Sequence, residues 1–335
     1  MNNQNASLVL KKNCFDYFRI YAAIQVLFGH MISLYGISLP RYNPIHYVGG
    51  VPILFTLCGF LVMGSYEKSK NTGEYFKKRF LRIFPPLWFS VWVGYFILWA
   101  FLGEAFPVWK AAMWTFLQGF ALQYTPSFAE GFGSGTFNGA LWALFTEIQF
   151  YLIVPVFYRV MRKKGIKCWI TVGILLLTIQ VLGTQLTKEM DSRALSLIWK
   201  RCILSQSNYF FIGSFLYVYR DSLLKGIIRY CPLLVLSYAT IYVINCFVNT
   251  GLLGLIVVEC LLPVLIITLG FYLGDHHLKY DVSYGIYLFH VMIINIFIEL
   301  NIRMNIGVAL MILLISCACG FASLLIDKCF RKALT

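Results

Sequence analysis

Charged residues are scarce in this sequence: Asp, Glu, Lys and Arg together make up 13% of its 335 residues. A soluble domain carries about a quarter of its residues as charged side chains. Hydrophobic residues account for 59% of the chain, and the mean hydropathy is +0.73. The composition therefore excludes a soluble globular protein and predicts that much of the surface faces a lipid bilayer.

Acidic residues are the scarcer kind of charge, with 14 Asp and Glu against 28 Lys and Arg, which gives a net charge of +14. The basic residues lie between apolar runs and not in a soluble basic domain, so we expect no nucleic-acid partner. Basic residues in such positions set the orientation of membrane helices. Most of them, beginning with Lys11 and Lys12, fall on the side that holds both termini, which we therefore predict to be cytoplasmic.

Patterns typical of a disulfide framework or a metal site are also missing. The 10 cysteines include no C-x-x-C pair, and most lie in apolar runs, where they serve as small apolar side chains. No predicted span carries two histidines or carboxylates at the spacing of a zinc or di-iron ligand pair, so we expect no metal. We also expect no cleavable signal peptide, because the first apolar run is longer than a signal core and no small-residue cleavage site follows it.

The sequence is rich in apolar runs of membrane-spanning length, which is about 20 residues. We predict about ten spans, at 15–37, 48–66, 86–103, 139–161, 168–186, 203–219, 231–248, 252–273, 282–302 and 305–326. A shorter and more polar stretch at 107–123 is expected to form an interfacial or re-entrant helix. We thus expect an all-α, polytopic membrane helix bundle, one integral-membrane domain over residues 1–335 with no fused extracytoplasmic domain.

The first span carries two ionisable residues, Arg19 and His30. The helical segment between them advances about 16 Å and turns by roughly 1,100°, so both side chains project from one stripe. Arg19 follows Asp16 at an i, i+3 spacing that favours a pair at the cytoplasmic end. An ionisable group inside the membrane is a functional candidate, which makes His30 a candidate catalytic residue. The alternatives are an arginine that snorkels to the interface and a histidine bonded to a neighbouring helix.

The fourth predicted span carries a carboxylate, Glu147, roughly 12 Å from its outer end and so near the depth predicted for His30. A carboxylate at that depth is costly to leave unpaired. Beside an imidazole it would orient the ring and stabilise imidazolium, so we predict Glu147 as a second catalytic residue. A structural ion pair or a bond to another span is the alternative. Gln149 points elsewhere and is expected to hydrogen-bond between helices.

The segment EYFKKRFLRIFPPLW, residues 74–88, places Arg79 and Arg82 on one helical face. They precede Pro85 and Pro86, which suit the first turn of the next span. Two guanidinium groups one turn apart suit a phosphate or a pyrophosphate. Ordinary positive-inside charge in contact with anionic lipid is the alternative interpretation.

Three further segments have features of a site. In GGVPILFTLCGFL, residues 49–61, small residues such as Gly59 allow helices to pack closely, and packing alone would explain the pattern. In SYGIYLFH, residues 283–290, Tyr287 and His290 give the ninth span a polar wall, for which we expect a supporting role. The loop YTPSFAEGFGSGTFNG, residues 124–139, is either the path of a sugar acceptor, whose rings stack on aromatic faces, or a plain connection.

These segments together resemble membrane acyltransferase family 3, polytopic enzymes that O-acylate surface glycans and related acceptors, over nearly the whole chain. Five family patterns appear in order: a basic residue and ten others before histidine at Arg19 to His30, CGFL at Cys58 to Leu61, R-x-x-R at Arg79 to Arg82, LWxLxxExxFYL at Leu141 to Leu152, and SYxIYLxH at Ser283 to His290. Cys58 stands where the family usually has serine, which puts any hydroxyl bond made there in question.

The resemblance implies acyl-CoA, usually acetyl-CoA, as the donor, with His30 as the catalytic residue and Arg79 and Arg82 as donor-binding residues. With Arg19 at the inner mouth, we expect a multi-pass O-acyltransferase of the cell membrane that transfers an acetyl group to a surface polysaccharide or its lipid-linked precursor. His30 would act as general base or be acylated itself. The alternatives are a transporter or flippase for a glycan precursor, against which no inverted repeat is visible, and a non-catalytic membrane partner.

Overall fold

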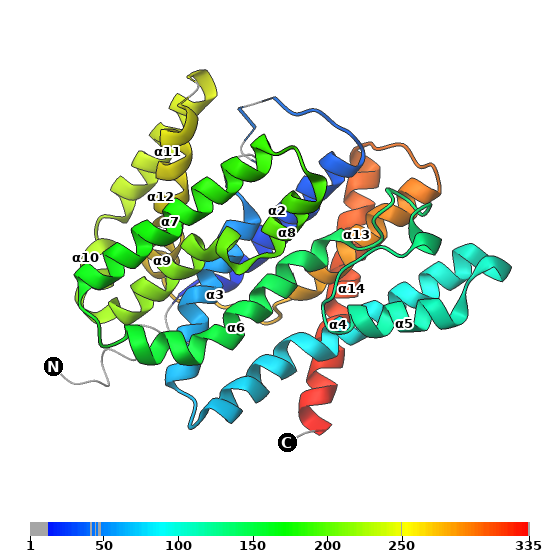
Figure 1. Cartoon of the computed structure of the whole chain (residues 1–335), viewed down its shortest axis with the longest axis horizontal. Helices are drawn as coiled ribbons and strands as arrows, with labels where there is room; N and C mark the ends of the chain where they lie inside the picture. Colours follow the sequence, from blue (N-terminus) through cyan, green and yellow to red (C-terminus); the bar gives the residue numbers. More distant parts are fainter. Residues whose placement is uncertain (1–12, 41, 44, 46–47, 249, 334–335) are drawn as a thin grey trace. The chain divides into compact units, whose positions relative to one another are not determined.

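The computed structural model describes residues 13–40, 42–43, 45, 48–248 and 250–333, and every regular element among them is a helix (Figure 1). The all-α prediction is confirmed. Lys11 and Lys12, which contributed to the predicted orientation, lie outside the described residues.

The contacts of the chain divide it into two compact units. Among the described residues, unit 1 comprises those within 1–22, 40–75 and 146–279, and unit 2 those within 23–39, 76–145 and 280–335. Three helices, α2 (Phe15–Leu34), α4 (Thr72–Leu102) and α6 (Trp142–Met161), contribute residues to both units. That the whole chain forms one integral-membrane domain stays a prediction.

Unit 1 is built around α3 (Gly50–Glu67), which packs along α9 (Ser207–Val218). Gly59 makes this close contact possible, because a Cβ at its position would overlap the backbone carbonyl of Phe210. The glycine therefore serves helix packing, as the simpler interpretation of its segment predicted. The other elements of unit 1 are α7 (Ile166–Glu189), α8 (Arg193–Arg201), η5 (Ile203–Gln206), η6 (Arg220–Leu224), α10 (Lys225–Ile228), α11 (Cys231–Phe247) and α12 (Gly251–Tyr272).

Unit 2 holds α13 (Ser283–Glu299) against α14 (Ile306–Ala333). A Cβ on Gly285 would meet the backbone of Gly320, so small residues again set the distance between two helices. The sequence from Ile286 to Ile294 is buried without interruption, which makes α13 the central helix of its unit. The remaining elements are α5 (Val108–Gln118) and the short turns η2 (Gly103–Ala105), η3 (Ser127–Ala129) and η4 (Gly139–Leu141).

Helix α4 runs without a break through Pro85 and Pro86, so the prediction that a new span begins at these prolines is wrong. Proline lacks the N–H that would bond the carbonyl four residues earlier, and Pro85 thereby removes the helical donor of the Leu81 carbonyl. The guanidinium of Arg331, on α14, donates to that carbonyl at 3.4 Å. A donor from another helix thus helps to satisfy the backbone of the uninterrupted helix.

Six of the described helices are long and apolar enough to cross a membrane, or seven if the bent pair Arg220–Ile228 and Cys231–Phe247 forms one span. The protein is therefore multi-pass, but the predicted count of ten spans is not confirmed. α9, with 12 residues, extends about 18 Å. α13, with 17 residues, extends about 26 Å, whereas the hydrocarbon core is about 30 Å thick. In the segment predicted to be interfacial or re-entrant, the structure forms the short helix α5.

Candidate active site

Two histidine side chains meet inside unit 2: His30, on α2, and His290, on α13. The distance from Nε2 of His290 to Nδ1 of His30 is 3.3 Å, and the ring centroids are 5.0 Å apart. His290 is 0% exposed, whereas His30 is partly exposed. The structure thus pairs the predicted catalytic histidine with a residue for which the sequence predicted only a supporting role.

The partners of His290 fix the tautomers of both rings. Its Nδ1 faces the carbonyl oxygens of Tyr287, at 2.8 Å, and of Ile286, at 3.2 Å. A carbonyl oxygen only accepts hydrogen bonds, so in the neutral ring Nδ1 carries the proton and Nε2 carries the lone pair. Nε2 of His290 therefore accepts from His30.

The same reasoning applies to His30. Its Nδ1 faces the lone pair of His290 and the carbonyl oxygen of Val26, at 3.0 Å, and both of these are acceptors. Nδ1 of His30 must therefore carry the proton, which leaves the lone pair on Nε2. In the neutral pair, Nδ1 of His30 donates to His290, and Nδ1 of His290 donates to the Tyr287 carbonyl. Nε2 of His30 is therefore the basic and nucleophilic atom of the pair.

The loop of residues 124–139 is tied to α13 by side chains that follow His290 on the same helix. The amide of Asn295 donates to the carbonyls of Thr136, at 2.9 Å, and Phe137, at 3.1 Å, and its oxygen accepts from the Ser134 N–H at 2.8 Å. The carboxylate of Glu299 accepts from the Gly133 N–H at 2.7 Å. The loop is therefore anchored to the helix that carries His290.

The aromatic side chains of this loop do not form the exposed stacking surface that one of the two sequence interpretations requires. Phe132 and Phe137 are 3% and 2% exposed and pack against each other with their ring centroids 5.5 Å apart. Phe128 packs edge-on against Trp114, at 6.2 Å. Of the four aromatic rings in the loop, the most exposed is that of Tyr124, at 42%. Most of the aromatic surface thus stabilises the fold of the loop.

Tyr287 supports the same region from within α13. Its hydroxyl donates to the carbonyl of Ala140, in η4, and its own carbonyl accepts from His290. Asn138, next to η4, donates from its amide to the carbonyl of Leu288 at 3.0 Å. These bonds fix the backbone that holds the buried imidazole.

Glu147 belongs to unit 1, where Cys58 and the hydroxyl of Tyr151 lie against its Oε1. The Cys58 sulfur is 3.9 Å from the carboxylate oxygen, so the thiol can donate a weak hydrogen bond where a serine hydroxyl would donate a stronger one. Gln149 bonds the Arg201 carbonyl at 2.8 Å and the Ile203 N–H at 3.2 Å, as predicted for a residue that links helices. That Glu147 orients His30 stays a prediction.

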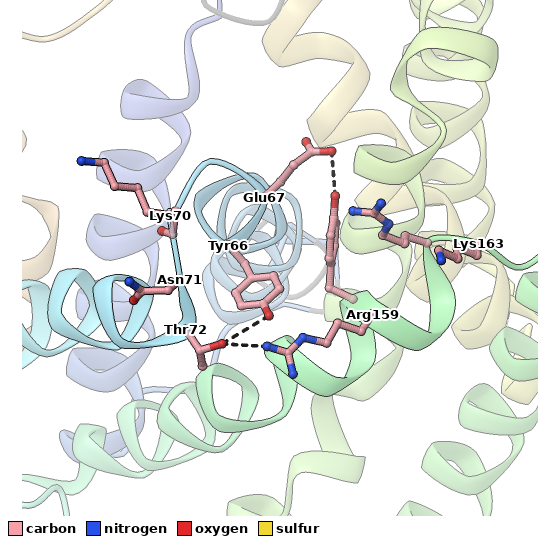
Figure 2. A pocket seen from close by; sticks show the side chains of 10 residues that line it. Tyr66, Glu67, Lys70, Asn71, Thr72, Arg159 and Lys163 are labelled. Carbon is pink, nitrogen blue, oxygen red and sulfur yellow. Dashed lines mark hydrogen bonds between the residues drawn. The ribbon is translucent and has the colours of Figure 1, made fainter.

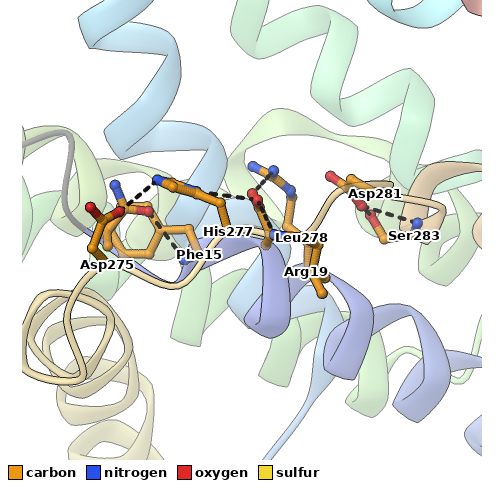
Figure 3. A network of polar contacts seen from close by, with 9 residues as sticks. Phe15, Arg19, Asp275, His277, Leu278, Asp281 and Ser283 are labelled. Carbon is orange, nitrogen blue, oxygen red and sulfur yellow. Dashed lines mark hydrogen bonds and ion pairs between the residues drawn. The ribbon is translucent and has the colours of Figure 1, made fainter.

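Arg19 pairs with Asp16, as the i, i+3 spacing predicted. The loop after α12 also contacts Asp16: Nδ1 of His277 lies 3.4 Å from its carboxylate, and the Leu278 N–H donates to it at 3.3 Å. Figure 3 shows His277 and Leu278 of this loop in one polar network with Arg19. His277 lies in a short loop, and no pattern in the sequence indicates its contact with Asp16. The network holds the start of α2, and a contact of Arg19 with a donor stays a prediction.

Arg79 and Arg82 lie one turn apart in the first part of α4, as predicted. Arg79 is partly buried and Arg82 is exposed. The hydroxyl of Tyr284, on α13, donates to the carbonyl of Ile83 at 3.0 Å, so this part of α4 is joined to the helix of His290. The role of Arg79 and Arg82 in donor binding stays a prediction.

Among the described residues, no group of three or more metal-ligating side chains occurs.

Comparison with known proteins gives one family and several relatives. The profile of the acyltransferase domain family matches residues 12–326. The O-acetyl transferase of Shigella phage Sf6 is 26% identical over 290 residues, which cover 83% of this chain and 84% of that protein. Nodulation protein 10 of Rhizobium leguminosarum bv. viciae is 29% identical over 192 residues, or 52% of this chain and 50% of that protein.

A third relative, the acyltransferase MdmB of Streptomyces mycarofaciens, is 26% identical over 129 residues, or 37% of this chain and 32% of that protein. The chain thus matches about half of the length of the nodulation protein and a smaller part of MdmB. No solved structure matches the chain.

Proposed function

The chain belongs to the acyltransferase domain family, and from this premise we propose that it transfers an acetyl group from cytoplasmic acetyl-CoA to a hydroxyl of a cell-surface polysaccharide or of its lipid-linked precursor. The observation that carries the proposal is the histidine pair, which leaves a lone pair on Nε2 of His30. That the chain is an O-acyltransferase follows from the family and from the phage O-acetyl transferase.

The choice of acetyl as the group transferred is supported by the name of that phage relative. A polysaccharide acceptor is supported by the resemblance to enzymes that O-acylate surface glycans. The cell membrane is the place where a cytoplasmic thioester and a surface glycan precursor are both within reach of one multi-pass protein.

In the first of two routes, Nε2 of His30 takes the proton of the acceptor hydroxyl while the oxygen attacks the thioester carbonyl. The tetrahedral intermediate collapses with cleavage of the carbon–sulfur bond, and the imidazolium returns its proton to the departing CoA thiolate. His290 holds the Nδ1 proton of His30 in place throughout, as a positioning residue.

In the second route, Nε2 of His30 attacks the thioester itself and the CoA thiolate leaves, so that the acetyl group is carried on the imidazole. The acceptor hydroxyl then attacks this acyl-imidazole, the carbon–nitrogen bond breaks with its electron pair returning to Nε2, and the hydroxyl proton passes to the CoA thiolate. Arg79 and Arg82 would bind the phosphates of the donor, Arg19 would line its entry, and Glu147 would balance the charge that develops on the imidazole.

The proposal is tested with the full chain purified in nanodiscs, radiolabelled acetyl-CoA and a panel of lipid-linked oligosaccharides. We expect label in an alkali-labile ester on the oligosaccharide. Binding of acetyl-CoA without transfer to any acceptor would contradict the proposal and indicate that the protein is a non-catalytic membrane partner. Absence of both binding and transfer would favour a transporter and overturn the proposal.

Replacing both Arg79 and Arg82 with alanine is expected to raise the KM for acetyl-CoA by about tenfold to a hundredfold, because charged hydrogen bonds to the donor phosphates are lost. The kcat should change little, since these bonds form equally in the ground state. Initial rates over a range of donor concentrations measure both constants. Arg303→Ala, an exposed arginine on the opposite predicted side, is the control. An unchanged KM would assign the pair to lipid anchoring.

A further inference from the structure

A polar pocket lies in unit 1 where α3 ends, α4 begins and α6 ends (Figure 2). Its volume is about 560 Å³, which falls in the range of small-molecule sites, and it is partly open to solvent. Its lining comes from residues 66–72 and 158–163, two segments on the side predicted to be cytoplasmic. We call it the basic pocket, because Lys70, Arg159, Arg162 and Lys163 line it.

The single carboxylate in the lining of the basic pocket, Glu67, is already engaged. It accepts from the hydroxyl of Tyr158 at 2.7 Å and from that of Tyr217, and it pairs with the guanidinium of Arg220 at 3.1 Å. Arg220 does not line the pocket and balances the negative charge of Glu67 from outside it. Glu67 also interacts electrostatically with Arg162, so the pocket holds four cations against one carboxylate that Arg220 already pairs with.

The two arginines are held in place by neutral groups. Nη2 of Arg159 donates to the hydroxyl of Thr72 at 2.9 Å, and its guanidinium lies 5.9 Å from the ring centre of Tyr66. The guanidinium of Arg162 lies 5.4 Å from the ring centre of Tyr158. A guanidinium has five N–H donors, so these contacts position the groups and leave donors for a ligand.

The chemistry of this lining points to a phosphate group. Guanidinium forks bind phosphate oxygens through paired hydrogen bonds, and lysine adds charge. The N-terminal end of α4, at Thr72, adds the positive end of a helix dipole to the same wall. Within the part of the chain that the structure describes, no ion pair is recorded for the side chains of Lys70, Arg159, Arg162 or Lys163.

We propose that the basic pocket binds a phosphate-bearing ligand from the cytoplasmic side. The lining of the pocket does not include Arg79 or Arg82, which belong to unit 2, and the proposal does not depend on the proposed acyl transfer. Two sources offer this chemistry: the headgroup of an anionic phospholipid and the nucleotide phosphates of a soluble cosubstrate. The pocket is lined mainly by polar side chains, which suits a headgroup or a nucleotide phosphate and not an acyl chain.

The test compares the wild type with Arg159→Gln combined with Arg162→Gln, in nanodiscs. One arm measures retention of phosphatidylglycerol by native mass spectrometry. Other arms titrate acetyl-CoA, acetyl-pantetheine without phosphates, and pyrophosphate into phosphatidylcholine nanodiscs. If the ligand is a lipid, we expect the double variant to bind phosphatidylglycerol at least about tenfold more weakly than the wild type. If the ligand is a nucleotide, we expect the same loss of affinity for acetyl-CoA and pyrophosphate. Binding of acetyl-pantetheine should be unaffected in either case.

The matched control is Lys164→Gln combined with Lys167→Gln, which removes the same charge from exposed residues of the same segment outside the pocket. Should the arginine variant prove unstable, Lys70→Gln with Lys163→Gln removes two exposed cations of the pocket instead. Equal binding of every probe by wild type and pocket variants would overturn the proposal, as would an equal loss in the control. Because ligand binding is measured directly, the binding result can be interpreted even if no acetyl transfer is detected.

Discussion

His30→Ala is expected to reduce acetyl transfer by about a thousandfold or more, because the variant lacks the atom that serves as base or nucleophile in both routes. The structure identifies the reactive atom. Nδ1 of His30 hydrogen-bonds to His290 and to the Val26 carbonyl, so Nε2 is the reactive position. Binding of acetyl-CoA should persist, since Arg79 and Arg82, which we propose to bind the donor phosphates, lie on another helix and are unchanged in the variant.

The measurement is initial-rate transfer of radiolabel, together with acetyl-CoA affinity and thermal stability of the same preparation. His276→Ala is the matched control, because His276 is an exposed loop histidine that takes no part in the pair. Single-turnover reactions without acceptor separate the two routes: label on the wild-type protein that is missing from the variant indicates an acyl-imidazole. Near-normal transfer by His30→Ala would remove His30 from the mechanism.

The second large effect is expected at His290. His290→Ala should lower kcat by about a hundredfold or more with little change in the KM for acetyl-CoA, because His30 loses the acceptor that holds its Nδ1 proton. His290→Gln should restore most of the activity, since a glutamine carbonyl oxygen can accept from His30 where the Nε2 of His290 does. This pattern distinguishes a positioning residue from one that only fills space.

Met292→Ala is the control for packing, because Met292 is a buried residue of the same helix that has no polar group. It should lower thermal stability by creating a cavity and leave kcat close to that of the wild type. The interpretation of His290 would be contradicted if His290→Ala kept nearly full kcat, or if the glutamine and alanine variants were equally impaired.

Much of the fold could be predicted from local patterns. Apolar runs of membrane-spanning length determine helices in lipid, because a helix satisfies its own backbone hydrogen bonds there. The family patterns around Arg19, Arg79 and Glu147 lie on α2, α4 and α6. The start of α4 was predicted incorrectly at its prolines. The Arg331 side chain, which donates to the Leu81 carbonyl left without a helical donor, comes from the other end of the sequence.

The candidate site was predicted less completely. His30 could be singled out, because an ionisable residue in an apolar run is conspicuous in any sequence. His290 is equally visible, and its polar neighbours Tyr284 and Tyr287 indicated a polar wall with a supporting role, but its sequence position does not state which residue it faces. The sequence favoured Glu147 as the partner from matched depth alone, whereas the hydrogen bond that the structure records for the His30 ring to another side chain is to His290.

The sequence by itself determined that this protein resides in a membrane, is built from helices and carries ionisable side chains where lipid would exclude them, since composition and periodicity are local properties. Only the tertiary structure decided that His30 and His290 form a hydrogen bond, that the aromatic loop is packed and anchored to α13, and that four cations line a pocket whose glutamate pairs with Arg220. Such pairings depend on how helices distant in sequence pack together, and no local pattern encodes that packing.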